Sequence, residues 1–288
     1  MKKQNLYIII TNSLQNDFIE KQFIEQIKKE TVEDPWKIDY DSLAERWSEY
    51  FKDRERLPKK NEINDFLNEL KNIKSKEILY SYHKFLKYYN HRVHVDVQQT
   101  EKLWNNERLP GFILQLMERS VEANKDENGD FYHFIHLRDW HDPTDAAERE
   151  EFCTFGYHCI KGSHGAQFIH PLDKYIEENE SFNHIINSNS LSSFSNTNLE
   201  SILDTIIDYN HSSKEDVKIG VFGVITNIKL KLLTFEIKVI HGFKNVYVCE
   251  ELSAGFNQKG HEDGLKYMKN VLGVKVYTEN EFREEFKF

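Results

Sequence analysis

The stretch LYIIITNSLQNDF, residues 6–18, decides the fold. Its first part, Leu6 to Ile10, is a continuous apolar run rich in β-branched residues. Such a run is typical of a strand that is buried on both faces of a parallel sheet. The polar residues that begin at Thr11 mark the end of this strand. Because both faces of such a strand must be covered, the run predicts a sheet with helices on each side.

Four more apolar runs of this kind lie further along the chain, at residues 131–137, 217–224, 245–249 and 274–277. Apolar residues with helical periodicity predict helices over residues 111–123, 198–208, 230–240 and 261–272. Strands that alternate with helices form right-handed βαβ units. We therefore predict an α/β fold with a doubly wound, mostly parallel sheet, and functional loops at the carboxyl ends of the strands.

The region between the first two strands has a different character. Residues 19–107 are highly charged and show helical periodicity, for example over 41–54, 61–73 and 77–89. We predict a helical insertion here, with residues 1–18 and 108–288 forming one α/β domain. The insertion is interpreted as a stabilising cap or a dimer surface, or alternatively as a lid that gates a ligand.

The composition limits the possible function classes. With 39% apolar and 13% aromatic residues, the 288-residue chain has enough material for a full core. A net charge of −10 argues against nucleic-acid binding, which needs a dense basic surface. Three cysteines without a regular framework favour a reduced, cytoplasmic location. No apolar stretch approaches the ~18 residues of a membrane span, so we expect a soluble protein without a membrane partner.

Five short segments, in order and at sensible spacing, resemble the isochorismatase-like hydrolases, the superfamily of isochorismatases, nicotinamidases and related amidases. They are residues 9–18 (IITNSLQNDF), 134–141 (FIHLRDWH), 157–168 (YHCIKGSHGAQF), 191–199 (LSSFSNTNL) and 223–229 (GVITNIK). The resemblance covers residues 1–18 and about 108–288, and leaves the insertion outside. It implies a Rossmann-like, three-layer fold, and a homo-oligomer, since members of the superfamily frequently assemble.

The family's catalytic triad consists of an aspartate, a lysine and a cysteine. Its cysteine lies at the start of a helix, loses its proton to the aspartate and forms a thioester with the substrate. By resemblance, the three triad positions are here Ser13, Ser188 and Lys229. A serine is no base at neutral pH, Ser188 carries no charge, and an amine cannot form the thioester. The sequence therefore predicts that cysteine hydrolase chemistry is lost.

Lys229 itself has two interpretations. As a partly buried lysine at a helix start, it forms a Schiff base with a ligand or binds an anion. Alternatively, its amine fills the vacated space and pairs with Asp139 or another carboxylate. The resemblance also implies a cis peptide bond between Val224 and Ile225. The residues predicted to line a ligand pocket are Ser13, Asp139, Ser188, Thr226, Asn227 and Lys229.

Asp139, His141 and His158 occupy positions that, by resemblance, bind a divalent metal in the nicotinamidase branch. An Asp-x-His pair with a third ligand suits zinc or iron. That branch has another histidine six residues after His141, where this chain has Ala147. The alternative interpretation is a hydrogen-bonded network at the strand end. Asp17 is expected to cap backbone N–H groups rather than to act as a base.

Three functions stay open at this point. The first is a pseudoenzyme that binds a small anionic or amide-bearing ligand, with the insertion reporting the ligand or recruiting a partner. The second is a hydrolase with non-standard chemistry on an amide, ester or vinyl ether, either metal-assisted or dependent on Lys229. The third is a structural or interaction protein. Side chains that fill the space between Ser13, Ser188 and Lys229 would favour the third function, and an open polar cavity would oppose it.

Overall fold

A computed structural model describes residues 4–19, 95, 99, 103, 108–125, 129–142, 145, 149–155, 158–169, 172–178 and 183–288. The chain divides into two compact units. The first contains residues 1–14, 95–139 and 171–288, and the second contains residues 15–94 and 140–170. The predicted helical insertion over residues 19–107 lies almost entirely outside the described residues. The insertion and the predicted domain bounds therefore stay predictions.

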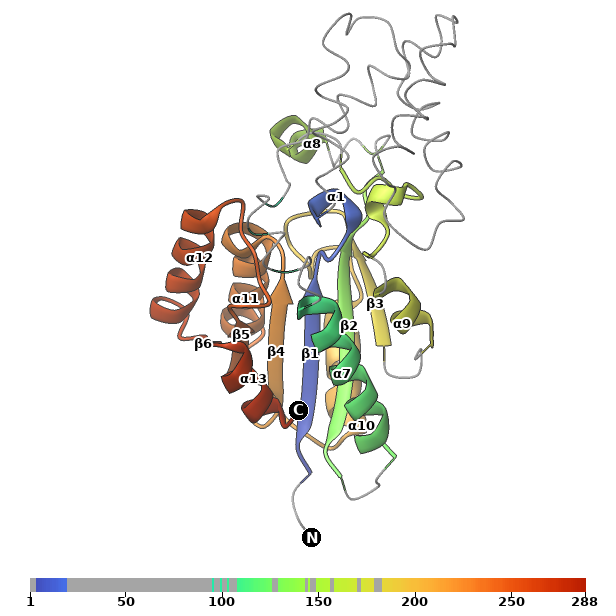
Figure 1. Ribbon diagram of the computed structural model, residues 1–288, viewed down its shortest axis with the longest axis vertical. Helices are drawn as coiled ribbons and strands as arrows, with labels where there is room; N and C mark the ends of the chain where they lie inside the picture. The colour runs from blue at the N-terminus through green and yellow to red at the C-terminus, as the bar shows by residue number, and fades with distance from the viewer. Residues whose placement is uncertain are drawn as a thin grey trace, which may run out of the picture. The chain divides into compact units, whose positions relative to one another are not determined.

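The first unit is built on a six-stranded sheet whose pairings are all parallel, in the order β3-β2-β1-β4-β5-β6 (Figure 1). The strands are β1 Leu6–Asn12, β2 Phe131–Asp139, β3 Asn183–Ser188, β4 Lys218–Gly223, β5 Asn245–Cys249 and β6 Lys275–Tyr277. All seven residues of β1 are buried, as expected for a strand with a neighbour on each edge and helices on each face. The predicted doubly wound sheet is confirmed.

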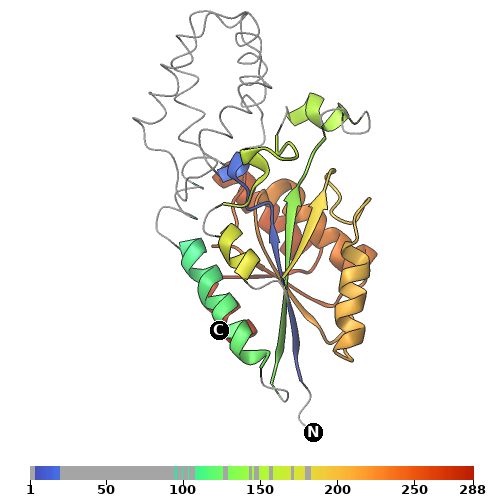
Figure 2. The same cartoon turned by 90° about the vertical axis from the view of Figure 1, so that its right-hand side faces the viewer.

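Helices cover both faces of the sheet, as the nearly edge-on view in Figure 2 shows for α7 and α10. One face carries α10 Leu199–Tyr209, α11 Lys231–Phe235 and α12 Gln258–Asn270, whose apolar side chains pack with those of the strands in one core. The other face carries α7 Arg108–Ala123 and α13 Glu279–Phe286, which are joined by ring contacts of Phe112 with Phe222 and Phe282. The short helix α9 Leu172–Glu178 contacts α7.

Two elements of the first unit do not follow from the hydrophobic pattern. β3 lies at the edge of the sheet, and Ile185 in it is 43% exposed. Because an edge strand is covered only in part, its sequence contains only a short apolar run, which is not enough to predict a strand. α13 is mostly charged, and a capping box between Thr278 and Glu281 begins it. The predicted helix at 230–240 is confirmed but begins earlier, because residues 226–240 form one helical run composed of η5 Thr226–Leu230, α11 and η6 Glu236–Ile240.

The second unit is described in part. It contains α1 Asn16–Ile19, α8 Arg149–Phe155 and the short helix η3 His164–Ala166. Asp17 is buried and its carboxylate accepts a hydrogen bond of 2.7 Å from the backbone N–H of Cys159, which confirms its predicted capping role. Across the described parts of the chain, no helix is both long and apolar enough to cross a membrane.

Candidate functional site

The candidate site of the first unit lies where four strands end. β1 and β4 are neighbours, but the chain continues from β1 toward β2 and β3, and from β4 toward β5 and β6. This reversal is the topological switch point, at which open α/β sheets bind their ligands. Gly223 ends β4 with a φ of +127°, and a Cβ there would lie 2.2 Å from the carbonyl oxygen of Asn12. Only glycine therefore allows the close approach of the two strands at this point.

An ion pair occupies the centre of this site. The Lys229 ammonium donates to Oδ1 of Asp139, and each side chain is only 5% exposed. Asp139 is the last residue of β2, and Lys229 lies in the first turn of the helix that follows β4. The pairing that the sequence offered as one interpretation of Lys229 is thus present. Because the two charges neutralise each other, the buried site has little net charge.

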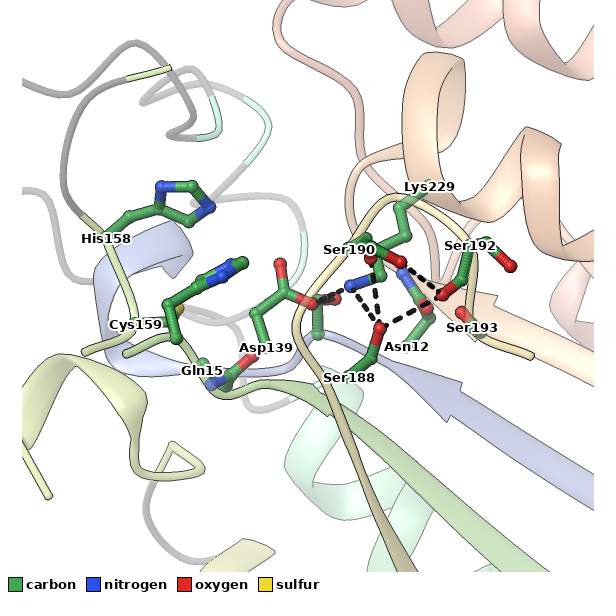
Figure 3. Close-up of polar contacts among 12 residues, drawn as sticks. Asn12, Gln15, Asp139, His158, Cys159, Ser188, Ser190, Ser192, Ser193 and Lys229 are labelled. Atoms are coloured by element: carbon green, nitrogen blue, oxygen red, sulfur yellow. Dashed lines mark hydrogen bonds and ion pairs between the residues drawn. The ribbon is translucent and has the colours of Figure 1, made fainter. Parts of the chain in front are cut away.

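The two serines at the other triad positions both contact this ion pair. The Ser13 hydroxyl lies 3.5 Å from Asp139 Oδ1. The Lys229 ammonium lies 3.4 Å from the Ser188 hydroxyl oxygen, as Figure 3 shows for these two side chains. Ser13 and Ser188 are each 1% exposed. The three positions that the resemblance selected therefore meet at the ion pair of Lys229 and Asp139, although none of them carries the residue that the family has at that position.

The side chains of Thr226 and Asn227 form hydrogen bonds with residues other than the ion pair and its two serines. The Thr226 hydroxyl is 2.9 Å from Nδ1 of His261 in α12. The side-chain Oδ1 of Asn227 accepts a hydrogen bond from the backbone N–H of Phe256 at 3.4 Å. Their predicted role in binding a ligand stays a prediction. The predicted cis peptide bond between Val224 and Ile225 is present just before them.

The second unit brings two of the three predicted metal ligands together. The rings of His141 and His158 have centroids 4.6 Å apart, and both residues are buried. Oε1 of Glu151, in α8, lies 3.8 Å from Nε2 of His141 and 3.9 Å from Nε2 of His158. Asp139, the third predicted ligand, belongs to the first unit and is separated from His141 along the chain by Trp140. Two imidazoles and a carboxylate form a donor set that suits zinc or iron.

Two carboxylates of these sites were missed by the sequence reasoning, Glu151 and Glu236. Glu151 lies ten residues after His141 in a segment that carries several acidic residues, so no spacing rule selects it. Glu236 binds the loop after β3, because the Ser192 hydroxyl donates to its Oε1 and the Ser193 N–H donates to its Oε2 at 3.3 Å. No local sequence signal selects Glu236 either, because its partner Ser192 lies 44 residues earlier in the chain.

A doubly wound domain with a polar centre at its switch point belongs to a large class of ligand-binding and catalytic α/β folds. No protein-family model matches the sequence, and no curated protein matches it significantly. Solved structures do match. A nicotinamidase/pyrazinamidase from Bacillus subtilis aligns with a TM-score of 0.53 at 17% identity, over 95% of this chain and 99% of its own.

Two further solved structures extend the likeness. An isochorismatase family protein from Desulfovibrio vulgaris aligns with a TM-score of 0.52 at 11% identity, over 99% of this chain and 100% of its own. An isochorismatase-like hydrolase from Alkaliphilus metalliredigens aligns with a TM-score of 0.50 at 14% identity, over 98% and 99%. At such low identity the likeness establishes the fold. The chain has the isochorismatase-like fold, as the sequence motifs predict.

Proposed function

We propose that this protein is an isochorismatase-like pseudoenzyme, which uses the converted catalytic centre to bind a small ligand or to support an interaction. The observation that carries the proposal is the buried ion pair of Lys229 and Asp139 at the place where the family forms its thioester. An ammonium has no lone pair with which to attack a carbonyl carbon. Its carboxylate partner is also engaged, so it is not a free base for a serine hydroxyl.

The polar groups around the ion pair favour a ligand that is neutral overall. The positive charge of Lys229 is already balanced by Asp139, so an anion gains little attraction there. Asn12 Oδ1 and Ser193 Oγ are buried atoms for which the described residues supply no hydrogen-bond partner. Asn12 directly precedes Ser13, and Ser193 belongs to the loop that carries Ser188. Since buried polar groups are normally hydrogen-bonded, a ligand that donates to Asn12 Oδ1 would complete the site.

The experiment that tests the proposal separates binding from turnover. Nicotinamide and pyrazinamide serve as probes, because they are named for the similar Bacillus subtilis structure. Binding is measured by isothermal titration calorimetry, and turnover is measured as ammonia release against a protein-free control. We expect no ammonia release from either amide and no covalent adduct in the denatured mass spectrum. Ammonia release that is abolished by Lys229→Ala would refute the pseudoenzyme and support a lysine-dependent hydrolase.

A second candidate function is favoured by the cluster of His141, His158 and Glu151. Here the protein is a metal-assisted hydrolase for an amide, ester or vinyl ether. The two imidazoles and the Glu151 carboxylate would hold a zinc or iron ion, with Asp139 as the further ligand that the sequence predicts. When bound, such a metal lowers the pKa of a coordinated water and polarises a carbonyl group.

Metal analysis of the purified protein tests this second candidate. Elemental analysis after purification without chelator should give about one zinc or iron ion per chain, and Glu151→Gln should lower the affinity for the metal about 10-fold or more. Glu284→Gln, at an exposed position in α13, is the matched control and should leave the metal content unchanged. A metal-free protein that does not take up zinc or iron on titration would eliminate this candidate.

The remaining parts of the proposal concern the cell and the assembly. We infer a cytoplasmic location from the cysteine usage and a homo-oligomer from the resemblance. Native mass spectrometry of the full chain measures the oligomeric state together with any retained ligand. A clean monomer without bound ligand would argue against both the oligomer and the binding role.

A further inference from the structure

A serine-rich loop, residues 188–195, begins at the last residue of β3 and leads toward the helix α10, which starts at Leu199. It contacts the buried ion pair through Ser188. The Ser188 hydroxyl lies 3.0 Å and 3.2 Å from the carbonyl oxygens of Ser190 and Ser192. The Ser190 hydroxyl donates to the same Ser192 carbonyl at 3.0 Å. The loop therefore folds back on itself so that one hydroxyl, that of Ser188, faces the Lys229 ammonium (Figure 3).

Glu236 fastens the middle of this loop to the helical run 226–240. Both carboxylate oxygens are used, one by the Ser192 hydroxyl and the other by the Ser193 N–H. Hydrogen bonds to a charged acceptor are stronger than those between neutral groups. The Ser192 hydroxyl oxygen in turn accepts from the Ser195 N–H at 3.0 Å. A single side chain thus fixes the positions of the serines that surround Ser188.

A second anchor lies at the end of the loop. The Phe194 ring stacks on the ring of His241, with centroids 3.9 Å apart and an angle of 18° between the ring planes. This stacking does not involve Glu236. Loss of the Glu236 carboxylate therefore frees the segment around Ser192 while the Phe194 end stays in place, which gives the loop a local opening rather than a general unfolding.

We propose that Glu236 is a positioning residue that latches the serine-rich loop over the buried Lys229, and that release of this latch is the step that admits a small molecule to the site. Lys229 and Ser188 are only 4% and 1% exposed, so a ligand reaches them only if a neighbouring segment moves. The loop moves by breaking two hydrogen bonds to one side chain, whereas the strands and the helical run are held by the core. This inference deepens the proposed ligand-binding function. The opening of the loop can be tested without a ligand, but its role in the cell rests on the proposed function.

The test measures the chemical accessibility of Lys229 and requires no ligand. The folded full-length chain is acylated with a water-soluble acetylating reagent, and each lysine is followed by mass spectrometry. Lys229 of the unsubstituted protein should react far more slowly than exposed lysines. Glu236→Ala should raise the acylation rate of Lys229 about tenfold or more, because the closed loop loses its hydrogen bonds to a charged group. Glu236→Gln keeps an oxygen that accepts from Ser192, and should give an intermediate rate.

Two controls make the outcome specific to the latch. Glu284→Ala removes an exposed carboxylate from α13 and should leave the Lys229 rate unchanged. Alkylation of Cys249, a buried thiol in β5, reports opening of the whole core and should stay slow in both Glu236 variants. The proposal is overturned if Lys229 stays equally protected in both Glu236 variants, or if the Lys229 and Cys249 rates rise together. If Glu236→Ala does not fold, the Gln variant alone decides between these results.

Discussion

Breaking the ion pair of Lys229 and Asp139 from one side should destabilise the protein strongly. Each side chain is 5% exposed, so Lys229→Met leaves a buried carboxylate without its cation, and Asp139→Leu leaves a buried ammonium without its anion. Removing one partner of a buried ion pair costs about 3–5 kcal/mol. For a chain of this length, that corresponds to a fall of roughly 5–8 °C in the melting temperature.

Replacing both partners together should cost much less than the sum of the two single changes. In Lys229→Met combined with Asp139→Leu, no charge is left without a partner, and an apolar pair of similar volume is often neutral or stabilising relative to a buried ion pair. The expected coupling free energy is therefore about 3 kcal/mol or more. Asp204→Asn is the exposed control, since Asp204 is 50% exposed and its pair with Lys214 should contribute less than about 1 kcal/mol.

The assay is urea unfolding of the four proteins of this cycle, followed by circular dichroism, with differential scanning calorimetry as a check on the melting temperature. Additive single and double changes would refute the reasoning, because they would mean that the two charges do not depend on each other. Single changes that each cost less than about 1 kcal/mol would refute it as well, because a buried charge without a partner is then tolerated.

Three further predictions follow from other buried groups. Burial lowers the pKa of His136 and of His133 to about 4 from an ordinary 6.5. The two neutral rings therefore contribute their full share to the free energy of unfolding above pH 6.5, and this contribution is lost as the pH falls from 6.5 toward 4. At pH 5 the loss is about 2 kcal/mol for each ring, and in urea titrations His136→Gln should show a smaller difference between pH 7.5 and pH 5 than the unsubstituted protein. Gly165→Ala places a Cβ 2.1 Å from the Asp17 carboxylate oxygens and should cost about 1–3 kcal/mol, measured by thermal unfolding; an unchanged melting temperature would contradict it. Burial raises the pKa of the Cys249 thiol to about 12, so iodoacetamide at pH 8 should modify it only after unfolding, and rapid alkylation of the native protein would oppose this view.

The central strands were predictable from the sequence because burial on both faces leaves an unbroken apolar run, as in β1 with Leu6 to Ile10. An edge strand leaves a weaker trace. In β3 the burial alternates, and Ile185 is largely exposed, so the run of apolar residues shrinks to two. The apolar pattern of a strand reflects which of its faces are covered by other elements. A strand with an exposed face therefore lacks the continuous apolar run by which the central strands were predicted.

The candidate site was predicted from the resemblance, whose motifs lie where strands end or helices begin. Ser13, Asp139, Ser188 and Lys229 all stand at such points, and the parallel order of the strands brings them together. Glu236 was not predictable in the same way, because its partner Ser192 is 44 residues away and only the packing of the helical run beside the loop joins them. Contacts made by side chains on the middle of a helix depend on tertiary structure, which no local pattern encodes.

The meeting of Ser13, Ser188 and Lys229 at one buried ion pair also constrains how the sequence can change in design. A lone Lys229→Cys exchange would supply a thiol but take the cation away from Asp139, and a lone Ser188→Lys exchange would add a second ammonium beside the first. A lone Ser13→Asp exchange would set two carboxylates against one amine. Each single step toward the triad of the family thus leaves a buried charge uncompensated. A design that introduces an Asp–Lys–Cys triad is therefore expected to need all three exchanges together.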